Sequence, residues 1–468
     1  MSSNLLVVNV CCLLFLLGCN SSTEPEVENE IIIEDPIIIE NPVIIDDAQQ
    51  DLFCDGLAKL NFIDATATHE IENYNASNTI DSNFISGSRW STSENDQSLV
   101  LTLDAPMSVK GISITWLNED SRSYSYDMEV SKDKIDWISV LSDELSNQSS
   151  TRSEYIETTE TTARYIKIIP KGNTFDDSSH IVEIEAFGCN ADVTSTIELD
   201  DWYLSIPVDE SSNSKAQSIK EQELNDNYFN AEFFFQDADG GLVFRSPIEG
   251  AKTSSNTKYT RTELREMLRR GNTSISTQGI NGNNWVFSSA SNDEQLAAGG
   301  VDGDLIAELA VNYVTTTGEE SQVGRVIIGQ IHANDDEPIR IYYRKLPQND
   351  KGSLYLAHEV NGGDDIYREL IGTRSQSADN PSNGIKLNER FGYRISVEGH
   401  QLTLTIIREG HADISEAVDM SDSGYDSGGQ YMYFKAGVYN QNSTGDPKDY
   451  VQATFYKIEN SHSGYLSN

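Results

Sequence analysis

The sequence has 468 residues, a formal net charge of −42 and a hydrophobic fraction of 37%. This length allows two or three domains with packed cores. The strong acidity excludes nucleic acid and anionic membrane surfaces as partners, because phosphate binding depends on Lys and Arg. Salt screens exposed charges beyond a Debye length of about 8 Å, so a cleft with its own cations can still bind a polyanion.

The first predicted element is a continuous apolar stretch over residues 5–17, which is short for a transmembrane helix and typical of a signal peptide. It ends in LLGC, with Cys19 last, and this ending resembles a bacterial lipobox. The resemblance implies a signal peptide over 1–19 and a cell-envelope lipoprotein, held by its lipid at the outer membrane and facing outward. A simple secretory signal is the alternative, because residues 1–4 contain no Lys or Arg.

Residues 20–50 form an acidic linker with the near-repeat IIIEDP (31–36) and IIIENP (37–42). Proline at the end of each unit prevents regular helix, and the acidic side chains repel one another. We expect an extended tether, although its apolar triplets could also pack on a neighbour.

The first folded unit is expected over residues 51–190. Short alternating runs separated by turns, such as 98–103 and 165–170, predict an all-β sandwich. Three of the five cysteines lie in the N-terminal run. The remaining pair, Cys54 and Cys189, predicts one disulfide in an exported protein.

Three motifs of this unit resemble discoidin-type (coagulation factor 5/8 C-terminal) domains: NTIDSN (78–83) followed by SRW (88–90), VSKDKIDW (130–137) and IVEIEAFG (181–188). The resemblance implies a jelly-roll sandwich that serves as a carbohydrate-binding domain. It also implies a structural calcium ion, for which Asp81, Asn83, Ser88 and Glu183 are the matching ligands. Ser82 replaces the usual glycine, and an ordinary Asx-rich turn is the alternative.

The second folded unit is expected over residues 191–460, and its chemistry concentrates in three segments. The first is YTRTELRE (259–266). If this segment is a strand, Arg261, Glu263 and Arg265 share one face. Two guanidinium groups beside a carboxylate suit planar recognition of another carboxylate. The alternatives are a helix, or a solvated charged edge.

The second segment is VIIGQIH (326–332), a buried strand in which Gln330 and His332 point to the same side. Polar residues that enter a core strand on one side suggest a site, although a lone histidine is more often structural.

The third segment is YMYFKAGVYNQ (431–441). Its alternation gives an apolar face of Met432, Phe434, Ala436 and Val438. The opposite face carries Tyr431, Tyr433, Lys435, Tyr439 and Gln441. Aromatic rings with hydrogen-bonding tips are what a sugar groove requires.

Together, these segments resemble the alginate lyases of polysaccharide lyase family 7, which carry Arg-x-Glu-x-Arg, Gln-Ile/Val-His and Tyr-Phe-Lys-Ala-Gly-x-Tyr-x-Gln in this order. The resemblance implies a concanavalin-like jelly roll, so the whole chain is expected to be all-β with two jelly-roll sandwich domains. It also implies cleavage of alginate by β-elimination, without a cofactor for catalysis.

The same resemblance implies the residue roles. Arg261 and Gln330 neutralise the uronate carboxylate, and His332 and Tyr439 share the base and acid duties. Neighbouring subsites are held by Glu263, Arg265, Lys435 and Gln441. Ile331, between Gln330 and His332, implies a preference for guluronate.

Two other functions compete with this one. A glycoside hydrolase needs two carboxylates that flank the scissile bond, and only ELDDW (198–202) faintly resembles such a strand. A non-catalytic glycan-binding surface lipoprotein is the other alternative. We expect a monomer whose partners are the polysaccharide and, through lipid, the membrane. Loops such as 299–304 and 361–365 would decide whether cleavage is internal or terminal.

Overall fold

The computed structural model describes residues 57–93, 97–147, 155–189, 197–209, 215–237 and 240–464. The chain divides into the segment Met1–Asp51 and a compact unit over Leu52–Asn468. The expected lipidation at Cys19, the acidic tether and the Cys54–Cys189 disulfide fall outside what the structure describes. In the described ranges no helix has the length and apolarity needed to cross a membrane.

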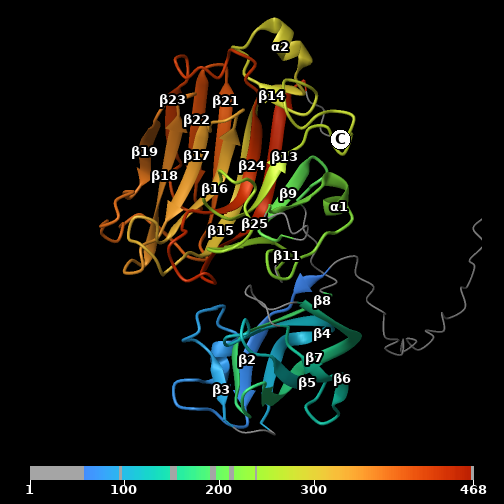
Figure 1. Cartoon of the computed structure of the whole chain (residues 1–468). Coiled ribbons are helices and arrows are strands. Elements are labelled where there is room, and N and C mark those ends of the chain that lie inside the picture. Colours follow the sequence, from blue (N-terminus) through green and yellow to red (C-terminus); the bar gives the residue numbers. More distant parts are fainter. Residues whose placement is uncertain are drawn as a thin grey trace, which may run out of the picture. The chain divides into compact units, whose positions relative to one another are not determined.

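Residues 57–189 form an antiparallel sandwich (Figure 1). Its strands follow the order β1-β8-β4-β7-β5-β6, with β2 paired to β4 and β3 paired to β8. Trp116 and Tyr124 stack at 4.5 Å inside its core. The elements are β1 (Ala58–Lys59), β2 (Phe62–Ala67), the 3-10 helix η1 (Ala76–Thr79), β3 (Trp90–Thr92), β4 (Leu99–Trp116), β5 (Tyr124–Ser131), β6 (Ile138–Leu145), β7 (Tyr155–Asn173) and β8 (Ser179–Cys189).

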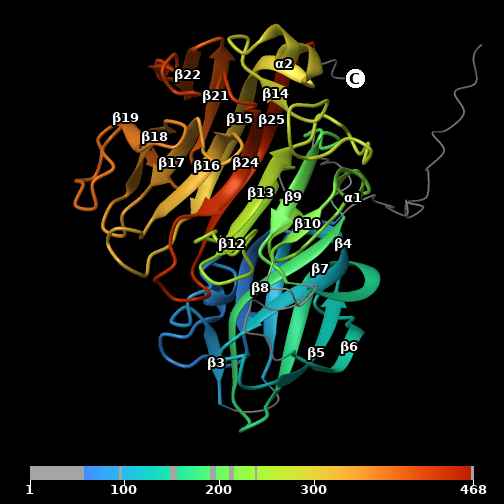
Figure 2. The same cartoon turned by 45° about the horizontal axis from the view of Figure 1, so that its top comes forward.

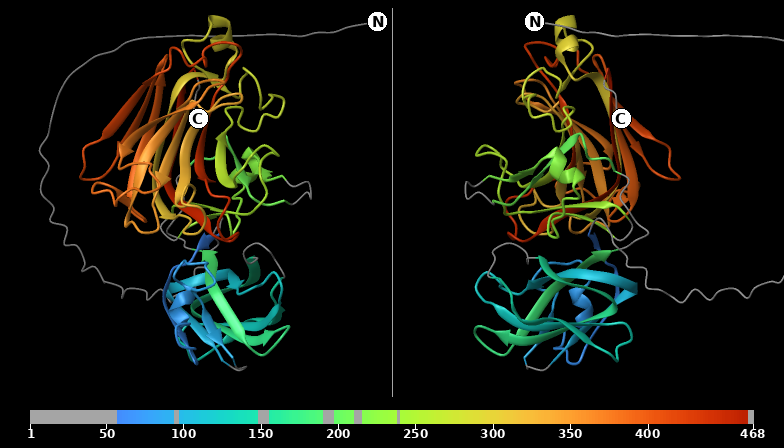
Figure 3. Two further views of the ribbon diagram at one scale, coloured as in Figure 1. Left: turned by 60° about the vertical axis from the view of Figure 1, so that its left-hand side comes forward. Right: turned by 90° about the vertical axis from the view of Figure 1, so that its right-hand side faces the viewer.

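Residues 197–464 form a second sandwich, which Figure 2 and Figure 3 show from other sides. Its first elements are β9 (Trp202–Ile206), β10 (Gln217–Ile219), α1 (Glu221–Asn225), β11 (Phe234–Gln236), β12 (Leu242–Pro247), β13 (Arg261–Glu266), β14 (Trp285–Val286), α2 (Asn292–Ala297) and β15 (Gly300–Tyr313). The remaining strands are β16 (Arg325–His332), β17 (Ile339–Arg344), β18 (Lys351–Glu359), β19 (Asp365–Ile371), β20 (Ile385–Lys386), β21 (Arg390–Glu398), β22 (Gln401–Ile407), β23 (Ile414–Asp419), β24 (Tyr433–Asn440) and β25 (Tyr450–Ser463).

These strands make two sheets. The front sheet has the order β10-β9-β13-β24-β16-β17-β18-β19, with β20 paired to β18. The back sheet runs β23-β22-β21-β15-β25-β12-β11, with β14 paired to β15. The apolar face predicted for the third segment, here represented by Phe434 and Val438, packs in one core with Tyr393 and Phe455 of the back sheet. The two sandwiches confirm the all-β fold class.

Two local expectations are settled by long-range pairing. The segment over 261–266 is strand β13 rather than helix, because it pairs with both β9 and β24. Residues 300–304 were expected in a loop because they are rich in Gly and Asp, and this was wrong. They begin β15, where Trp285 and Val286 pair with Gly300 and Val301.

A buried ion pair joins the front sheet to β25 of the back sheet. Glu266, at the end of β13, lies 2.8 Å from Nε2 of His462, and both side chains are fully buried. The same carboxylate accepts hydrogen bonds from Asn460 Nδ2 at 2.6 Å and from the Phe434 amide at 3.0 Å. His462 Nδ1 contacts the Asp302 carbonyl at 2.6 Å. With both ring nitrogens facing acceptors, the charged imidazolium is the form that satisfies the site.

This ion pair predicts a pH-dependent stability. Burial alone would lower the pKa of His462, but the Glu266 carboxylate and the hydrogen bonds raise it above 6.5. The stabilisation is therefore fully present below pH 6.5 and is lost as the pH rises through the raised pKa. We expect His462→Gln to lower the free energy of unfolding by about 3–5 kcal/mol, as breaking a buried pair does, and to remove this pH dependence.

Denaturant unfolding across neutral and alkaline pH measures both effects, with the exposed His411→Gln as the control. An unchanged pH profile in His462→Gln would contradict the assignment.

Candidate active site

The three segments singled out from the sequence lie side by side in the front sheet, as the adjacent strands β13, β24 and β16. Lys435 of β24 is the register partner of Arg265 on one side and of Gln330 on the other. Tyr439 is opposite Arg261, and Tyr433 is opposite His332. The predicted polar faces therefore meet on one surface of one sheet.

Two glycines permit this arrangement. Gly437 has φ +134°, and a Cβ there would lie 2.6 Å from the Thr262 carbonyl oxygen. Gly329 lies at a register shift of β16, where a Cβ would lie 2.4 Å from the Tyr393 hydroxyl of the back sheet. The shift changes the phase of β16, so that Ile327 packs with Tyr439 on the same surface that Gln330 reaches three residues later.

A buried carboxylate stands at the centre of this surface. Glu263 is 1% exposed. It accepts a hydrogen bond from Arg261 Nη1 at 2.9 Å and one from Gln330 Nε2 at 2.5 Å, and it forms an ion pair with Lys435 Nζ. Arg261 lies on β13, Lys435 on β24 and Gln330 on β16, so the three partners come from three strands. The carboxylate therefore fixes the directions of the cations beside it.

These contacts determine the charge states. Burial acts to raise the pKa of Glu263, but Lys435 and Arg261 outweigh it and hold the pKa below 4.5. Burial, with the neighbouring Arg261 charge, lowers the pKa of Lys435 to about 8. At neutral pH the cluster of Arg261, Glu263 and Lys435 carries two positive charges and one negative charge. It is a locally cationic surface in an acidic protein.

His332 faces this cluster as a neutral ring. Burial, together with Lys435 and Arg261, lowers the pKa of His332 to about 4. Its ring stacks on Tyr433, with centroids 5.1 Å apart and planes 10° apart. A neutral imidazole can accept a proton at the pH where the cations are still charged.

Tyr439 lies beside Arg261, whose guanidinium carbon is 3.7 Å from the centre of the phenol ring. Burial raises the pKa of Tyr439 and the Arg261 charge opposes that rise. The phenol therefore holds its proton at neutral pH, next to a cation that would stabilise the phenolate once the proton is given away.

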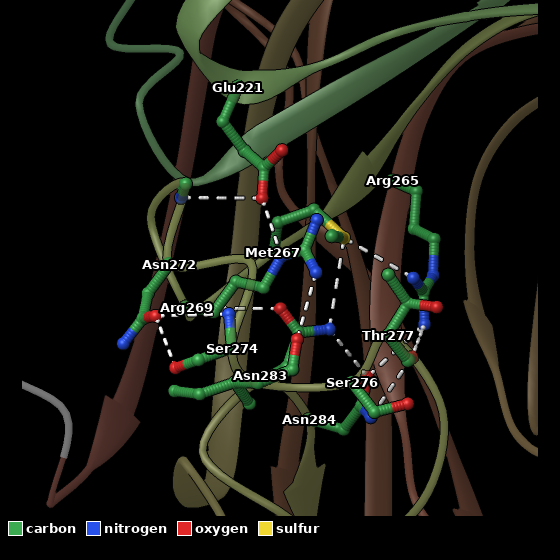
Figure 4. A network of polar contacts seen from close by, with 12 residues as sticks. Glu221, Arg265, Met267, Arg269, Asn272, Ser274, Ser276, Thr277, Asn283 and Asn284 are labelled. Atoms are coloured by element: carbon green, nitrogen blue, oxygen red, sulfur yellow. Dashed lines mark hydrogen bonds and ion pairs between the residues drawn. The ribbon is translucent and has the colours of Figure 1, made fainter.

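Arg265 shares the face of β13 with Arg261 and Glu263 but has other partners (Figure 4). Its Nη2 donates to the Thr277 carbonyl at 2.6 Å and to Asn284 Oδ1 at 3.2 Å. In the same network, Arg269 Nε donates to Glu221 Oε1 at 2.8 Å. Arg265 therefore fixes the segment over 269–284 while its guanidinium lies 3.9 Å from the centre of the Tyr433 ring.

Gln441 lies beyond the end of β24 and is 5% exposed. Its side-chain Nε2 donates to the backbone carbonyl of Asn440 at 3.4 Å. The backbone carbonyl of Gln441 accepts a hydrogen bond from Arg325 Nη2 at 3.3 Å. Ile331, the residue from which guluronate preference was expected, is fully buried in the core between the sheets. Its side chain points away from the surface that carries Gln330 and His332.

Sequence reasoning missed part of this surface. Tyr342 and Tyr355 stack at 4.9 Å with planes 6° apart, and Tyr367 and Tyr439 pack against the same cluster. The cluster extends the site surface from β24 across β17, β18 and β19. The alternation in IRIYYR (339–344), which places Arg340, Tyr342 and Arg344 on one face, was an available signal.

In the first sandwich, Asp81, Ser88 and Glu183, three of the four matched calcium ligands, come together. The side chain of the fourth, Asn83, accepts a hydrogen bond from the Ile85 backbone amide. Asp81 accepts hydrogen bonds from the backbone N–H of Asn83 at 2.8 Å and from Ser88 Oγ at 2.6 Å. Glu183 is 2% exposed, and burial raises its pKa well above 4.5 with Asp81 adding to the rise. Its Oε2 has no hydrogen-bond partner within the described ranges. Ser82, which replaces the usual glycine, has φ +59°. A buried oxygen without a partner fits a cation at this place.

The chain is similar to known proteins over both sandwiches. The profile of the alginate lyase family matches residues 197–462, which is more than half of the chain, and that of the F5/8 type C domain matches residues 64–184. An alginate lyase of Klebsiella pneumoniae is 58% identical over 274 residues, covering 57% of this chain and 89% of that protein. The crystal structure of the alginate lyase from Klebsiella pneumoniae matches with 57% identity and a TM-score of 0.57, covering 57% of this chain and 97% of that one. The chain therefore belongs to the alginate lyase family, and the protein is a polysaccharide lyase.

Proposed function

We propose that the protein cleaves the 1,4-glycosidic bonds of alginate by β-elimination and leaves 4,5-unsaturated uronate ends. The observation that carries this proposal is the grouping of His332, Tyr439 and the cations held by Glu263 on one surface of the front sheet. A uronate needs these three functions: a base for the C5 proton, an acid for the departing O4 and positive charge at its carboxylate.

Arg261 and Gln330 support the carboxylate role. Arg261 donates through Nη1 to Glu263, and its buried Nε has no hydrogen-bond partner in the described part of the chain. Gln330 gives one amide hydrogen to Glu263 and keeps a second. Donors that are already oriented stabilise the charge that develops on the carboxylate when C5 loses its proton, and such preorganisation is often the largest catalytic contribution.

In the proposed step, the lone pair of His332 takes the C5 proton and the C5–H electrons move toward the carboxylate. They return to form the C4–C5 double bond as the C4–O4 bond breaks. Tyr439 gives its proton to O4, so the leaving sugar departs as an alcohol. Lys435, Arg265 and Gln441, with Glu263, position the neighbouring sugars, and the Tyr342–Tyr355 stack offers aromatic surface to further units.

Tyr439→Phe tests the acid assignment. The substitution keeps the ring beside Arg261 and removes only the oxygen, so turnover should fall roughly 10²- to 10⁴-fold while KM changes little. Ultraviolet absorbance of the unsaturated ends measures turnover on alginate.

The matched control is Tyr433→Phe, which keeps the ring stacked on His332 and should cost far less. Near-normal formation of unsaturated product by Tyr439→Phe would exclude this tyrosine as the acid.

We propose that guluronate-containing alginate is preferred. The Gln-Ile-His segment supports this preference through the family resemblance, and Ile331 acts through the placement of β16, since its side chain is in the core. The configuration at C5 decides which face of the sugar presents the proton. We assign His332 as the base for guluronate, with Tyr439 able to act alone on mannuronate.

His332→Ala should therefore lower turnover of polyguluronate by roughly 10²-fold or more and affect polymannuronate less. Initial rates on the two defined block polymers measure the difference. Faster turnover of polymannuronate by the unaltered protein would overturn the preference, and equal losses on both polymers would overturn the division of roles.

The remaining features concern placement of the enzyme. We propose that the first sandwich binds glycan and that Asp81, Ser88 and Glu183 hold a calcium ion there. A thermal shift on adding Ca²⁺ would test the calcium site.

We also propose that lipid on Cys19 anchors a monomer to the outer membrane, facing outward. Release of Cys19→Ser from the membrane fraction would test that anchor.

A further inference from the structure

The protonation of the His332 ring follows from its contacts. Nδ1 lies 2.6 Å from the carbonyl oxygen of Ala333. A carbonyl oxygen only accepts, so Nδ1 carries the hydrogen and the neutral ring keeps its lone pair on Nε2. Nε2 is thus the atom that can take a proton.

A carboxylate that the mechanism has not yet used faces this nitrogen. Glu337, in the turn between β16 and β17, places Oε1 3.4 Å from His332 Nε2. The two side chains are 19% and 20% exposed, so solvent screens the contact only in part. A lone pair and an ionised oxygen do not attract each other, but an imidazolium and a carboxylate do. The contact becomes favourable when His332 gains a proton.

Glu337 belongs to a cluster of three carboxylates around one guanidinium. Arg340 Nη1 lies 3.7 Å from Glu337 Oε2, and Arg340 Nη2 lies 3.0 Å from Glu359 Oε2 and also pairs with Asp365. Burial and a hydrogen bond with Glu337 raise the pKa of Glu359 to about 7. Arg340 is the group that ties Glu337 into this cluster.

We propose that Glu337 is a positioning residue for His332: its carboxylate orients and stabilises the imidazolium formed when His332 takes the C5 proton, and Arg340 holds Glu337 in place. This inference rests on the proposed function. Glu337 acts through His332.

The proton balance is complete. The C5 proton moves to Nε2 of His332, and the C–H electron pair goes to the uronate and then to the new double bond. The proton given to O4 comes from Tyr439. After product leaves, His332 releases its proton to water and the Tyr439 phenolate takes one from water, so no other reactant is needed.

Other charged and titratable groups act on this pair from every neighbouring strand. Arg261 and Lys435 oppose a charge on His332, whereas Glu337 favours it. Charged and titratable groups near Glu337 and Glu359 also include Arg340, Asp336, Asp365, Tyr425 and Tyr439. Among the acidic groups of the described residues, Glu337 forms the ion-pair contact with the His332 ring.

The test is Glu337→Gln, measured as kcat and KM on polyguluronate and on polymannuronate across pH. The amide keeps the shape and removes the charge. We expect kcat on polyguluronate to fall about tenfold or more, the change that one pKa unit represents, with KM nearly unchanged. The acidic limb of kcat/KM should move to lower pH, because His332 becomes a weaker base. Turnover of polymannuronate should change less and also shows that the variant is folded.

Matched variants separate a specific role from a general one. Glu337→Asp keeps the charge and should retain more activity than Glu337→Gln. Glu398→Gln removes an exposed carboxylate from β21 of the back sheet and should change nothing. In a His332→Ala background, Glu337→Gln should have no further effect.

The outcomes distinguish the role of His332 as the base from the role of Glu337 as its positioning residue. If His332→Ala leaves guluronate turnover unchanged, the proposed base and this inference fail together. If His332→Ala is damaging but Glu337→Gln is not, only the role of Glu337 fails. Equal losses on both polymers, an unshifted acidic limb, or a further loss in the His332→Ala background would also overturn it.

Discussion

The geometry of the site depends on one carboxylate sealed from water. Removing an ion from water costs several kcal/mol even after relaxation, and Glu263 meets that cost with Arg261, Lys435 and Gln330. Because these partners come from three strands, the carboxylate couples strand register to the direction of each donor. The anion inside the sheet thus arranges the cations that an anion from outside would meet.

This arrangement also explains how an acidic protein acts on an acidic polymer. The net charge of −42 describes the whole chain, whereas binding depends on the field within a few ångströms of the surface, because salt screens the rest. Around Glu263 the local balance is positive. Burial keeps Lys435 close to its titration point, with its pKa at about 8, and leaves His332 neutral beside it. The same buried environment thus holds a neutral proton acceptor, His332, beside side chains that are positively charged at neutral pH.

Features with a local periodicity could be predicted from the sequence. The alternation over 431–441 placed Phe434 in the core and Lys435 on the site surface, and the same reasoning put Gln330 and His332 together. Features that depend on distant pairing could not. Residues 300–304 have the composition of a loop, but Gly300 and Val301 pair with Trp285 and Val286. Arg265 has the pattern of a substrate ligand, and that pattern does not show that Thr277 and Asn284 accept its hydrogen bonds. Glu337 lies in an acidic turn, and this composition predicts only a solvent-exposed loop.

The close approach at Gly329 has a consequence for how such an enzyme can change over evolutionary time. The Tyr393 hydroxyl donates to the Ile328 carbonyl at 3.0 Å and fills the space that a side chain at position 329 would need. A larger residue at 329 therefore requires a smaller one at 393, which would leave the Ile328 carbonyl without its partner. The two positions, one in each sheet, are expected to vary together or not at all, so the back of the sandwich limits which variants of the catalytic surface are accessible.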